Sequence, residues 1–212
     1  MKKRGLFLMC ILLVAATSCR QEVSDDCESE QEIMCTCPHV KVLIQPFNGT
    51  PTKTVTQLKR DLEKHLAEFS GVDVSSIEIL PGQDLTPDLM NAAHTRYRAD
   101  KILHKDRKRY RQGTITIFVT NKDISIPYKG KPDHGIRGLS FKAGEAVVVS
   151  TYRCGAKNPL WRVATHEFIH EFWHHGHCVK DDPKCIMQDA KGKGNLAAAT
   201  GLCTACQEHI GI

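Results

Sequence analysis

The densest cluster of metal-binding side chains in this sequence is a short histidine-rich segment. Five of the eleven histidines fall between His166 and His177. His166 and His170 are four residues apart, and Glu167 directly follows the first of them. Histidines at this spacing lie on one face of a helix, so both imidazoles can reach one metal ion, and the glutamate can act as general base on a water bound there. The spacing therefore predicts a zinc site with Glu167 as its catalytic residue.

The alternative is a polar helix face with two incidental histidines, because the pattern also occurs by chance. The segment around it is rich in large apolar side chains, namely Leu160, Val163, Ala164, Phe168 and Phe172. Burial of two imidazoles and a carboxylate in such a core helix requires compensating partners, and a metal ion supplies one. We therefore favour the metal site.

A second, overlapping copy of the pattern runs from His170 through Glu171 to His174. One zinc ion cannot bind all three histidines of a continuous helix, because residues eight apart are separated by about 12 Å along its axis. The first copy leaves room for the helix to end and for the chain to return a third ligand. The second copy leaves only two residues before His177. The first copy is therefore the predicted one.

The third ligand is expected beyond the end of the helix. His177 is the best candidate, because Gly176 before it can break the helix. His174 and His175 are its competitors. Their alternative role is a polar helix end, where histidine suits the helix dipole.

Four cysteines form a second cluster near the C-terminus: Cys178, Cys185, Cys203 and Cys206. The last two have C-x-x-C spacing, and four thiolates suit a tetrahedral structural zinc ion. Two disulfides are the rival interpretation, which an exported protein permits. The short C-x-x-C loop favours zinc.

The N-terminus has the features of an export signal. Three basic residues at positions 2–4 precede an apolar run at 6–16, which is too short to span a bilayer comfortably. The small residues before Cys19 resemble a bacterial lipobox, in which the cysteine is lipid-modified; an ordinary cleaved signal peptide is the alternative. We expect residues 1–18 to be removed. Cys19 would then anchor the exported protein to a bacterial membrane, on the periplasmic side or at the cell surface.

Residues 19–38 are polar and acidic, and we expect them to tether this anchor to a folded domain at 39–212. The tether contains Cys27, Cys35 and Cys37. In an oxidising compartment these cysteines can form disulfides, and Cys154 is a further candidate for pairing.

The charge balance gives no support for nucleic-acid binding. The chain carries 29 basic and 24 acidic residues, but three of the basic residues lie in the export signal, which leaves 26 against 24. The basic run from Arg96 to Arg111 is interpreted as a solvated helix face, since only Tyr97 and Tyr110 accompany it as aromatic residues.

The elements that must position the histidines and cysteines alternate along the domain. Apolar, β-branched runs predict strands at 40–47, 77–80, 114–120 and 146–151. The chain of 212 residues is long enough for one domain with a real core. We expect an α+β fold with a mixed twisted sheet, packed helices and an irregular cysteine-rich C-terminal lobe.

Three helices are predicted between the strands. One begins at a capping box at Thr54, one runs from Thr86 to about Tyr110, and one begins at Asn158 and Pro159 and carries the histidines. Residues 121–139 contain several prolines and glycines and are expected to form a long loop.

Together these motifs resemble the archaemetzincins, whose pattern is HExxHxxGxxHC, then CxM, then CxxC. The matching residues are His166 to His170, then His177-Cys178, then Cys185-Ile186-Met187, then Cys203 to Cys206. Upstream segments at 90–99, 115–119, 135–138 and 147–150 are also similar to that family. The resemblance covers about residues 40–210.

The resemblance implies a metzincin-like zinc peptidase acting on peptide or protein substrates, and we expect a monomer. The ligands of the catalytic zinc would be His166, His170 and His177. The ion would activate a water from which Glu167 takes a proton, while the four cysteines would hold a second, structural zinc. Met187 would lie under the catalytic site as the Met-turn. A peptide would pair with the strand at 146–151 as the sheet edge.

The sequence departs from the family pattern after the second histidine. Trp173 takes the place of the family's glycine, and the gap to His177 is one residue longer. Since tryptophan disfavours the left-handed turn that glycine permits, we expect the helix to continue and to end at Gly176. Two alternatives to a peptidase remain. One is a non-catalytic, lipid-anchored zinc-binding surface protein with a degenerate site, and the other is a disulfide-stapled binding module without metal.

Overall fold

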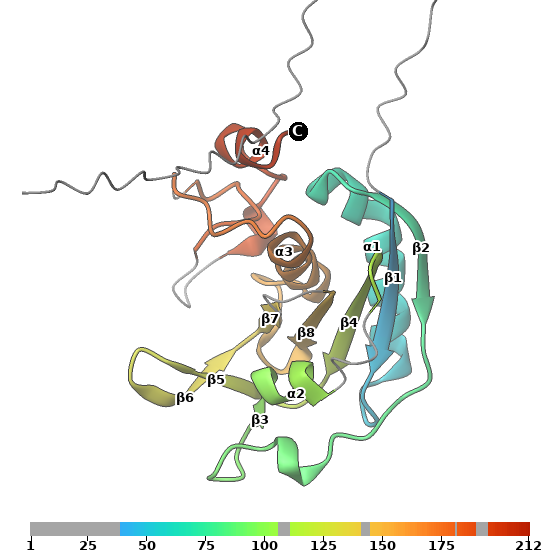
Figure 1. Ribbon diagram of the computed structural model, residues 1–212, viewed down its shortest axis with the longest axis vertical. Coiled ribbons are helices and arrows are strands. Elements are labelled where there is room, and N and C mark those ends of the chain that lie inside the picture. The colour runs from blue at the N-terminus through green and yellow to red at the C-terminus, as the bar shows by residue number, and fades with distance from the viewer. Residues whose placement is uncertain (1–38, 106–110, 141–144, 181, 190–194) are drawn as a thin grey trace, which may run out of the picture. The chain divides into compact units, whose positions relative to one another are not determined.

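Figure 1 shows the computed structural model of the chain, which describes residues 39–105, 111–140, 145–180, 182–189 and 195–212. These residues belong to one compact unit that spans residues 36–212. The export signal, the acidic tether and the cysteines within them, including Cys19, lie outside the described residues. What was expected of them stays a prediction.

The described residues form a mixed α/β fold with four α-helices. The strands are β1 (His39–Pro46), β2 (Asp73–Ile79), β3 (Tyr97–Arg98), β4 (Thr114–Thr120), β5 (Ile124–Tyr128), β6 (Lys131–Ile136), β7 (Gly138–Ser140) and β8 (Ala146–Ser150). The helices are α1 (Thr52–Ser70), α2 (Ala99–Lys105), α3 (Leu160–Phe172) and α4 (Thr204–Ile210), with short 3-10 turns η1 (Pro87–Leu89), η3 (Thr151–Arg153) and η4 (Leu196–Ala198).

A mixed five-stranded sheet forms the centre of the fold, in the order β2-β1-β4-β8-β7 (Figure 1). The strands β2, β1, β4 and β8 are parallel, whereas β7 is antiparallel to β8. The four strands predicted from apolar runs correspond to β1, β2, β4 and β8. The prediction of a mixed sheet with packed helices is therefore confirmed.

Side chains alternate between the two faces of this sheet. One face, which includes Ile117 and Val147, packs against α1 and α3. The opposite face, which includes Phe118 and Val148, packs against α2 and part of a smaller sheet, β3-β5-β6. Because successive residues point to opposite faces, a strand covered on both sides must be apolar throughout, and β8 is buried at every position. The sheet thus holds the histidine helix α3 against a fixed core face.

The prediction of an irregular loop over 121–139 is wrong. β5 and β6 form a hairpin whose two turn residues, Lys129 and Gly130, have φ angles of 45° and 77°. Two left-handed residues make the tight turn that suits twisted strands. Pro127 falls at a shift in the strand register, where its missing N–H costs least. The chain then enters β7, which becomes an edge of the main sheet.

The helix predicted from Thr86 to Tyr110 is also wrong over most of its length. Only residues 87–89 and 99–105 are helical, and residues 106–110 lie outside the described part of the chain. The Asn91 side chain accepts hydrogen bonds from the backbone N–H groups of Thr95 at 2.9 Å and Arg96 at 3.2 Å. These bonds close a loop that competes with helix formation.

The basic run is only partly a solvated helix face. Arg96 forms ion pairs with Asp123 at 2.7 Å and Asp133 at 3.1 Å, and Arg98 pairs with Asp100 at 2.8 Å. Arg96 therefore ties the loop to the region of β5 and β6, whereas the Arg98 pair is local.

Two helix starts differ in detail from the predictions. α1 begins at Thr52 behind Pro51, so the capping box at Thr54 is not used. α3 begins at Leu160 behind Pro159. The Asn158 side chain does not cap α3, because its oxygen accepts the N–H of Leu196 at 3.4 Å.

The C-terminal segment is more regular than expected, since it contains η4 and α4. Cys203 is the N-cap residue of α4, and Cys206 is buried on that helix. In the part of the chain that the structure describes, no helix is both long and apolar enough to cross a bilayer.

Candidate functional site

The histidine helix ends earlier than the sequence suggested. α3 stops at Phe172, and Trp173 is its C-cap residue with an ordinary right-handed φ of −91°. The Trp173 indole N–H donates to the carbonyl of Ser70 at 2.8 Å and so fixes this end of α3 to α1. His174 then takes the left-handed conformation, with φ of 50°. The expectation that the helix continues to Gly176 is therefore wrong.

This turn explains the longer gap after the second histidine. The family pattern has its glycine three residues before the third histidine, and His174 stands three residues before His177. The left-handed residue therefore keeps its distance from the third histidine, and the additional residue of the gap lies before it. Histidine is among the residues that adopt this conformation more readily than most, so the turn forms without glycine.

The turn brings three imidazoles together. Nε2 of His170 lies 3.1 Å from Nε2 of His166 and 3.3 Å from Nε2 of His177. The ligand atoms of all three residues lie within 4.8 Å of one another. A tetrahedral ion with Zn–N bonds of about 2.05 Å requires nitrogen separations of roughly 3.3 Å. The spacing fits one metal ion.

The hydrogen bonds of two rings support the same conclusion. Nδ1 of His166 lies 2.7 Å from the Ile186 carbonyl, and Nδ1 of His170 lies 2.6 Å from the His175 carbonyl. A carbonyl only accepts, so each Nδ1 carries the proton and each Nε2 of a neutral ring presents a lone pair. Two lone pairs facing each other are stabilised by a cation between them.

Both rings are neutral near pH 7. Burial, with a contribution from neighbouring His170, lowers the pKa of His166 to about 3. Burial also lowers the pKa of His170 to about 4, although its bond to the His175 carbonyl acts the other way. His177 is exposed, so the group is open to solvent on one side. An open side is typical of a catalytic rather than a structural metal site.

Glu167 lies between this group and the edge strand β7. Burial raises the pKa of the Glu167 carboxyl to about 8, although a hydrogen bond from the Ser140 backbone opposes the shift. Its side chain packs directly on Gly138, where an added Cβ would lie 2.6 Å from Glu167 Cγ and 2.8 Å from Oε1. Gly138 thus provides the space that the carboxylate occupies.

A cleft of about 500 Å³ opens beside these residues. His166, Glu167 and His177 line it together with Val163 and Leu196. Gln188 and Asp189, which follow Met187, line it as well. A molecule in the cleft would lie beside the imidazoles and the carboxylate.

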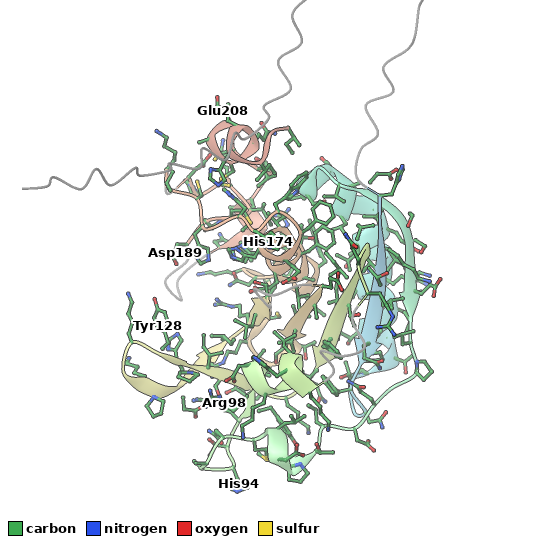
Figure 2. All side chains as sticks on the ribbon, in the orientation of Figure 1. His94, Arg98, Tyr128, His174, Asp189 and Glu208 are labelled. Atoms are coloured by element: carbon green, nitrogen blue, oxygen red, sulfur yellow. The ribbon has the colours of Figure 1, made fainter. Side chains whose placement is uncertain are left out.

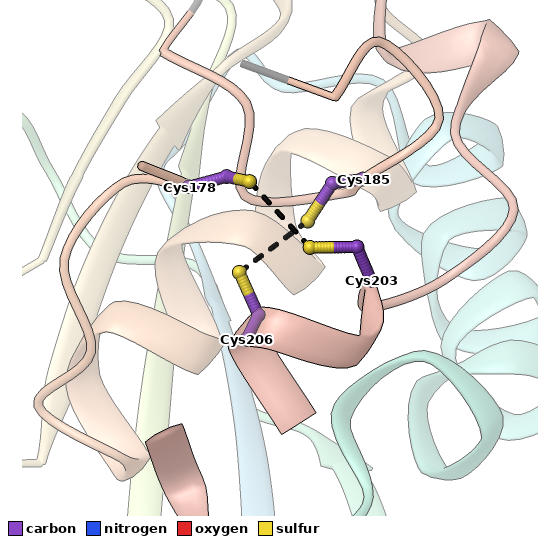
Figure 3. A group of neighbouring side chains, drawn as sticks. All are labelled: Cys178, Cys185, Cys203 and Cys206. Carbon is purple, nitrogen blue, oxygen red and sulfur yellow. Dashed lines mark hydrogen bonds between the residues drawn. The ribbon is translucent and has the colours of Figure 1, made fainter. Parts of the chain in front are cut away.

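The four C-terminal cysteines form a second group, shown in Figure 3. Cys178 Sγ lies 3.5 Å from Cys203 Sγ, and Cys185 Sγ lies 3.6 Å from Cys206 Sγ. All four sulfur atoms lie within 4.8 Å of one another. A tetrahedral zinc ion with Zn–S bonds of about 2.3 Å requires sulfur separations of roughly 3.8 Å. The group therefore has the arrangement of a four-thiolate metal site, and these cysteines form no disulfide.

The thiols of this group differ in acidity. Burial raises the pKa of Cys185 to about 11 and also raises that of Cys206. Burial acts in the same direction on Cys178, but backbone N–H groups of Asp182 and Lys180 donate to its sulfur and the net shift of its pKa is downward. Only a cation would hold all four as thiolates, because a bound metal deprotonates its thiol ligands.

The competing histidines are placed elsewhere. His174 is exposed at the turn (Figure 2). His175 is buried, and its ring packs on His209 of α4 with centroids 4.8 Å apart. Glu171 of the second copy is also buried and accepts the backbone N–H of Glu145. The structure thus brings together the first copy of the pattern and not the second.

Met187 is fully buried. Its carbonyl accepts the N–H of Cys178 at 2.7 Å, and its neighbour Ile186 supplies the carbonyl that binds His166. Cys154 lies apart from the cysteine group, and its thiol donates to the Ser150 carbonyl at 3.1 Å. Its predicted partners in the tether lie outside the described residues.

One prediction about the sheet is wrong in a way that affects the site. β8 was expected to be the edge strand, but it lies between β4 and β7, and the edge beside Glu167 is β7. Sequence reasoning missed β7 and Gly138 because it assigned that region to a loop. The glycine next to Arg137 was the available signal, since a glycine within a strand indicates close approach of another group.

The comparisons with known proteins concern the fold. No family model and no curated protein matches the chain. Two similar solved structures are archaemetzincins. The one from Methanopyrus kandleri has a TM-score of 0.65 at 19% identity and covers 84% of this chain and 97% of its own. The one from Archaeoglobus fulgidus, solved with malonate, has a TM-score of 0.54 at 24% identity and covers 80% of this chain and 99% of its own. The chain therefore has an archaemetzincin-like fold, as its motifs suggested.

Proposed function

We propose that this chain is a zinc-dependent metallopeptidase that hydrolyses peptide bonds with Glu167 as general base. The observation that carries the proposal is the convergence of three histidine Nε2 atoms beside a carboxylate, at the side of an open cleft. The archaemetzincin-like fold supports it.

Two zinc ions are proposed. His166, His170 and His177 would hold the catalytic ion, and Cys178, Cys185, Cys203 and Cys206 a structural one. Zinc at the histidines would polarise the scissile carbonyl and lower the pKa of a water molecule. The carbonyls of Ile186 and His175 fix the orientation of the first two imidazoles, which keeps their Nε2 atoms available as ligands.

Glu167 provides the proton transfers. Its carboxylate takes a proton from the attacking water and returns it to the leaving amine of the peptide. The contact with Gly138 and the hydrogen bond from Ser140 hold this carboxylate beside the edge strand. A cation at the three imidazoles would favour the ionised form of the neighbouring Glu167, which is the form that acts as general base.

The edge strand β7 is the proposed platform for the substrate. An extended peptide can add to an exposed sheet edge through main-chain hydrogen bonds. Residues 138–140 lie against Glu167, so a peptide paired there would pass beside the carboxylate. This assignment replaces the one made for the strand at 146–151.

The proposed location is a bacterial membrane, on its periplasmic side or at the cell surface, with Cys19 as the lipid-bearing residue. The support is the short apolar run followed by small residues and a cysteine. A radiolabelled fatty acid should be incorporated into the expressed wild-type chain and not into a Cys19→Ala variant. Equal labelling of both would exclude Cys19 as the anchor.

Peptide cleavage by three proteins tests the catalytic assignment. Wild type loaded with zinc should cleave a mixed peptide pool, and Glu167→Gln should lose at least about 100-fold in rate, within the range expected of general base catalysis. Glu171→Gln is the matched control, since it changes the corresponding glutamate of the second copy, and it should retain most of the activity.

Equal cleavage by wild type and Glu167→Gln would show that the mechanism is wrong. A wild-type protein that binds zinc only through its cysteines, with no loss of metal on His166→Ala, would favour a non-catalytic zinc-binding protein instead.

A further inference from the structure

Two basic side chains line the cleft beside the histidines. Arg137, which precedes β7, and Lys129, at the tip of the β5–β6 hairpin, both line it. Neither forms an ion pair with any carboxylate in the described residues. The position of these charges bears on which substrate side chain the cleft accepts.

Arg137 differs from the arginines around it. Arg96, Arg98 and Arg153 each pair with an aspartate at 2.7 to 2.8 Å. Arg137 is only half-buried and its Nε donates to the Arg153 carbonyl at 3.3 Å. This hydrogen bond restrains the guanidinium. The remaining N–H groups of Arg137 stay available to donate to a ligand. A planar guanidinium with unused donors matches a carboxylate best, because it can bind both oxygens at once.

Lys129 adds a second cation to the same cleft. The left-handed turn places it at the hairpin tip, and its ammonium lies 5.2 Å from the centre of the Tyr128 ring. The Tyr128 ring in turn packs on the His134 ring with centroids 5.2 Å apart, and both residues also line the cleft. Tyr128 is labelled in Figure 2. The aromatic pair provides a surface on which the chain of a substrate residue can lie.

Two acidic residues, Glu167 and Asp189, line the cleft as well. Glu167 is the proposed base, packed on Gly138. The charge of Asp189 acts on His166. Neither is within ion-pair distance of Arg137 or Lys129. The guanidinium and the ammonium therefore keep N–H donors that neither carboxyl group of the cleft occupies.

Resting on the proposed peptidase function, we propose that this cleft selects peptides with an aspartate or glutamate in the residue that enters it, and that Arg137 is the specificity-determining residue with Lys129 in support. The substrate class is thus acidic peptides. An uncharged amide of the same shape would leave the guanidinium without its ionic partner, which lowers affinity.

Binding tests this inference separately from catalysis. The full chain with Glu167→Ala is immobilised and exposed to a random hexapeptide mixture, and retained peptides are identified by mass spectrometry. Peptides with Glu or Asp should be retained at least about tenfold over their Gln or Asn counterparts. Adding Arg137→Met should remove this preference, whereas Arg137→Lys, which keeps the charge, should retain part of it. Arg60→Met is the matched control, since it removes a positive charge from an exposed position of α1.

Equal retention of acidic and amide peptides, retention of neither, or a preference unchanged by Arg137→Met would each overturn the inference. Selective retention of acidic peptides by a chain whose wild type cleaves none of them would support the inference while overturning the proposed hydrolysis. The two proposals therefore fail in distinguishable ways.

Discussion

The carbonyl oxygen of Ile186 lies 2.7 Å from Nδ1 of His166. Ile186 directly follows Cys185, and His177 directly precedes Cys178. The loop that contributes two thiols to the cysteine group therefore also orients one imidazole and supplies another. The two groups share a backbone, so a change in one is expected to reach the other.

Removal of one thiol should weaken metal binding at the histidines. Cys203→Ser should lose the metal of the cysteine group, and the loop should then hold Ile186 and His177 less firmly. Loss of such outer partners typically costs 10- to 100-fold in metal affinity. Cobalt titration followed by visible absorption measures the histidine site directly. Cys154→Ser is the control and should leave both sites unchanged; equal behaviour of the two variants would mean that the groups are independent.

A methyl group on Gly138 should displace Glu167. The added Cβ would lie 2.6 Å from Glu167 Cγ, closer than such atoms approach, so the carboxylate must move. A displacement of about 1 Å can cost on the order of 100-fold in rate. We expect kcat/KM of Gly138→Ala to fall by about this factor while its melting temperature stays near wild type.

Gly155→Ala is the matched control for this substitution, because an added Cβ there meets no atom within 4 Å. It should retain wild-type kcat/KM. Undiminished activity of Gly138→Ala would mean that the position of Glu167 is not set by this contact.

Because the left-handed turn lies at His174, glycine substitutions at His174 and at Trp173 should have opposite effects on the free energy of unfolding. His174 has φ of 50°, so His174→Gly relieves a left-handed strain and should leave the free energy of unfolding unchanged or raise it by up to about 1 kcal/mol. Trp173→Gly restores the glycine of the family pattern but removes the packed indole and its bond to Ser70. It should lower the free energy of unfolding by about 3 kcal/mol. Urea unfolding measures both, and a stabilising Trp173→Gly would contradict the assignment of the turn to His174.

Asp123 should make the fold acid-sensitive. It pairs with Arg153 and Arg96, both at 2.7 Å, and its side chain is 12% exposed. Burial acts to raise the pKa of Asp123, but hydrogen bonds and charges from the two arginines hold it below its ordinary value. Its ionised form therefore contributes stability in full above the unfolded-state pKa of about 3.9. That contribution is lost as pH falls through the lower, folded-state pKa.

Asp123→Asn should accordingly lower the free energy of unfolding by about 3 kcal/mol at pH 7, as expected when a buried ion pair loses one partner. The difference from wild type should shrink below about pH 4. Both proteins keep the same metal ligands, so their difference isolates Asp123. Glu78→Gln, which removes an exposed pair with Lys41, should cost less than about 1 kcal/mol. A difference for Asp123→Asn that stays constant down to pH 2 would exclude the assigned shift.

The parts of the site that were predictable from sequence are those set by local spacing. His166 and His170 share a helix face because they are one turn apart, and the C-x-x-C turn is equally local. Local spacing alone does not predict that His177 approaches the other two histidines. This approach depends on the backbone of His174 and on the Trp173 bond to Ser70, a residue 103 positions away.

In the fold, too, features set by local sequence were predicted and features set by distant contacts were missed. Strands with continuous apolar runs, such as β4 and β8, were predicted because burial on both faces demands that composition. The β5–β6 hairpin was missed because its turn forms at Lys129 and Gly130, and the prolines nearby suggested a loop. Gly138 was missed as a site residue because its importance lies in a contact with Glu167 that only the folded chain creates.

Anomalous X-ray scattering tests the central claim most directly, which is that zinc lies among three histidines beside Glu167. Diffraction data from crystals of the purified protein would be recorded on both sides of the zinc absorption edge. The account predicts two difference peaks, one among the Nε2 atoms of His166, His170 and His177 and one among the four cysteine sulfurs. Absence of a peak at the histidines, with zinc supplied, would contradict it.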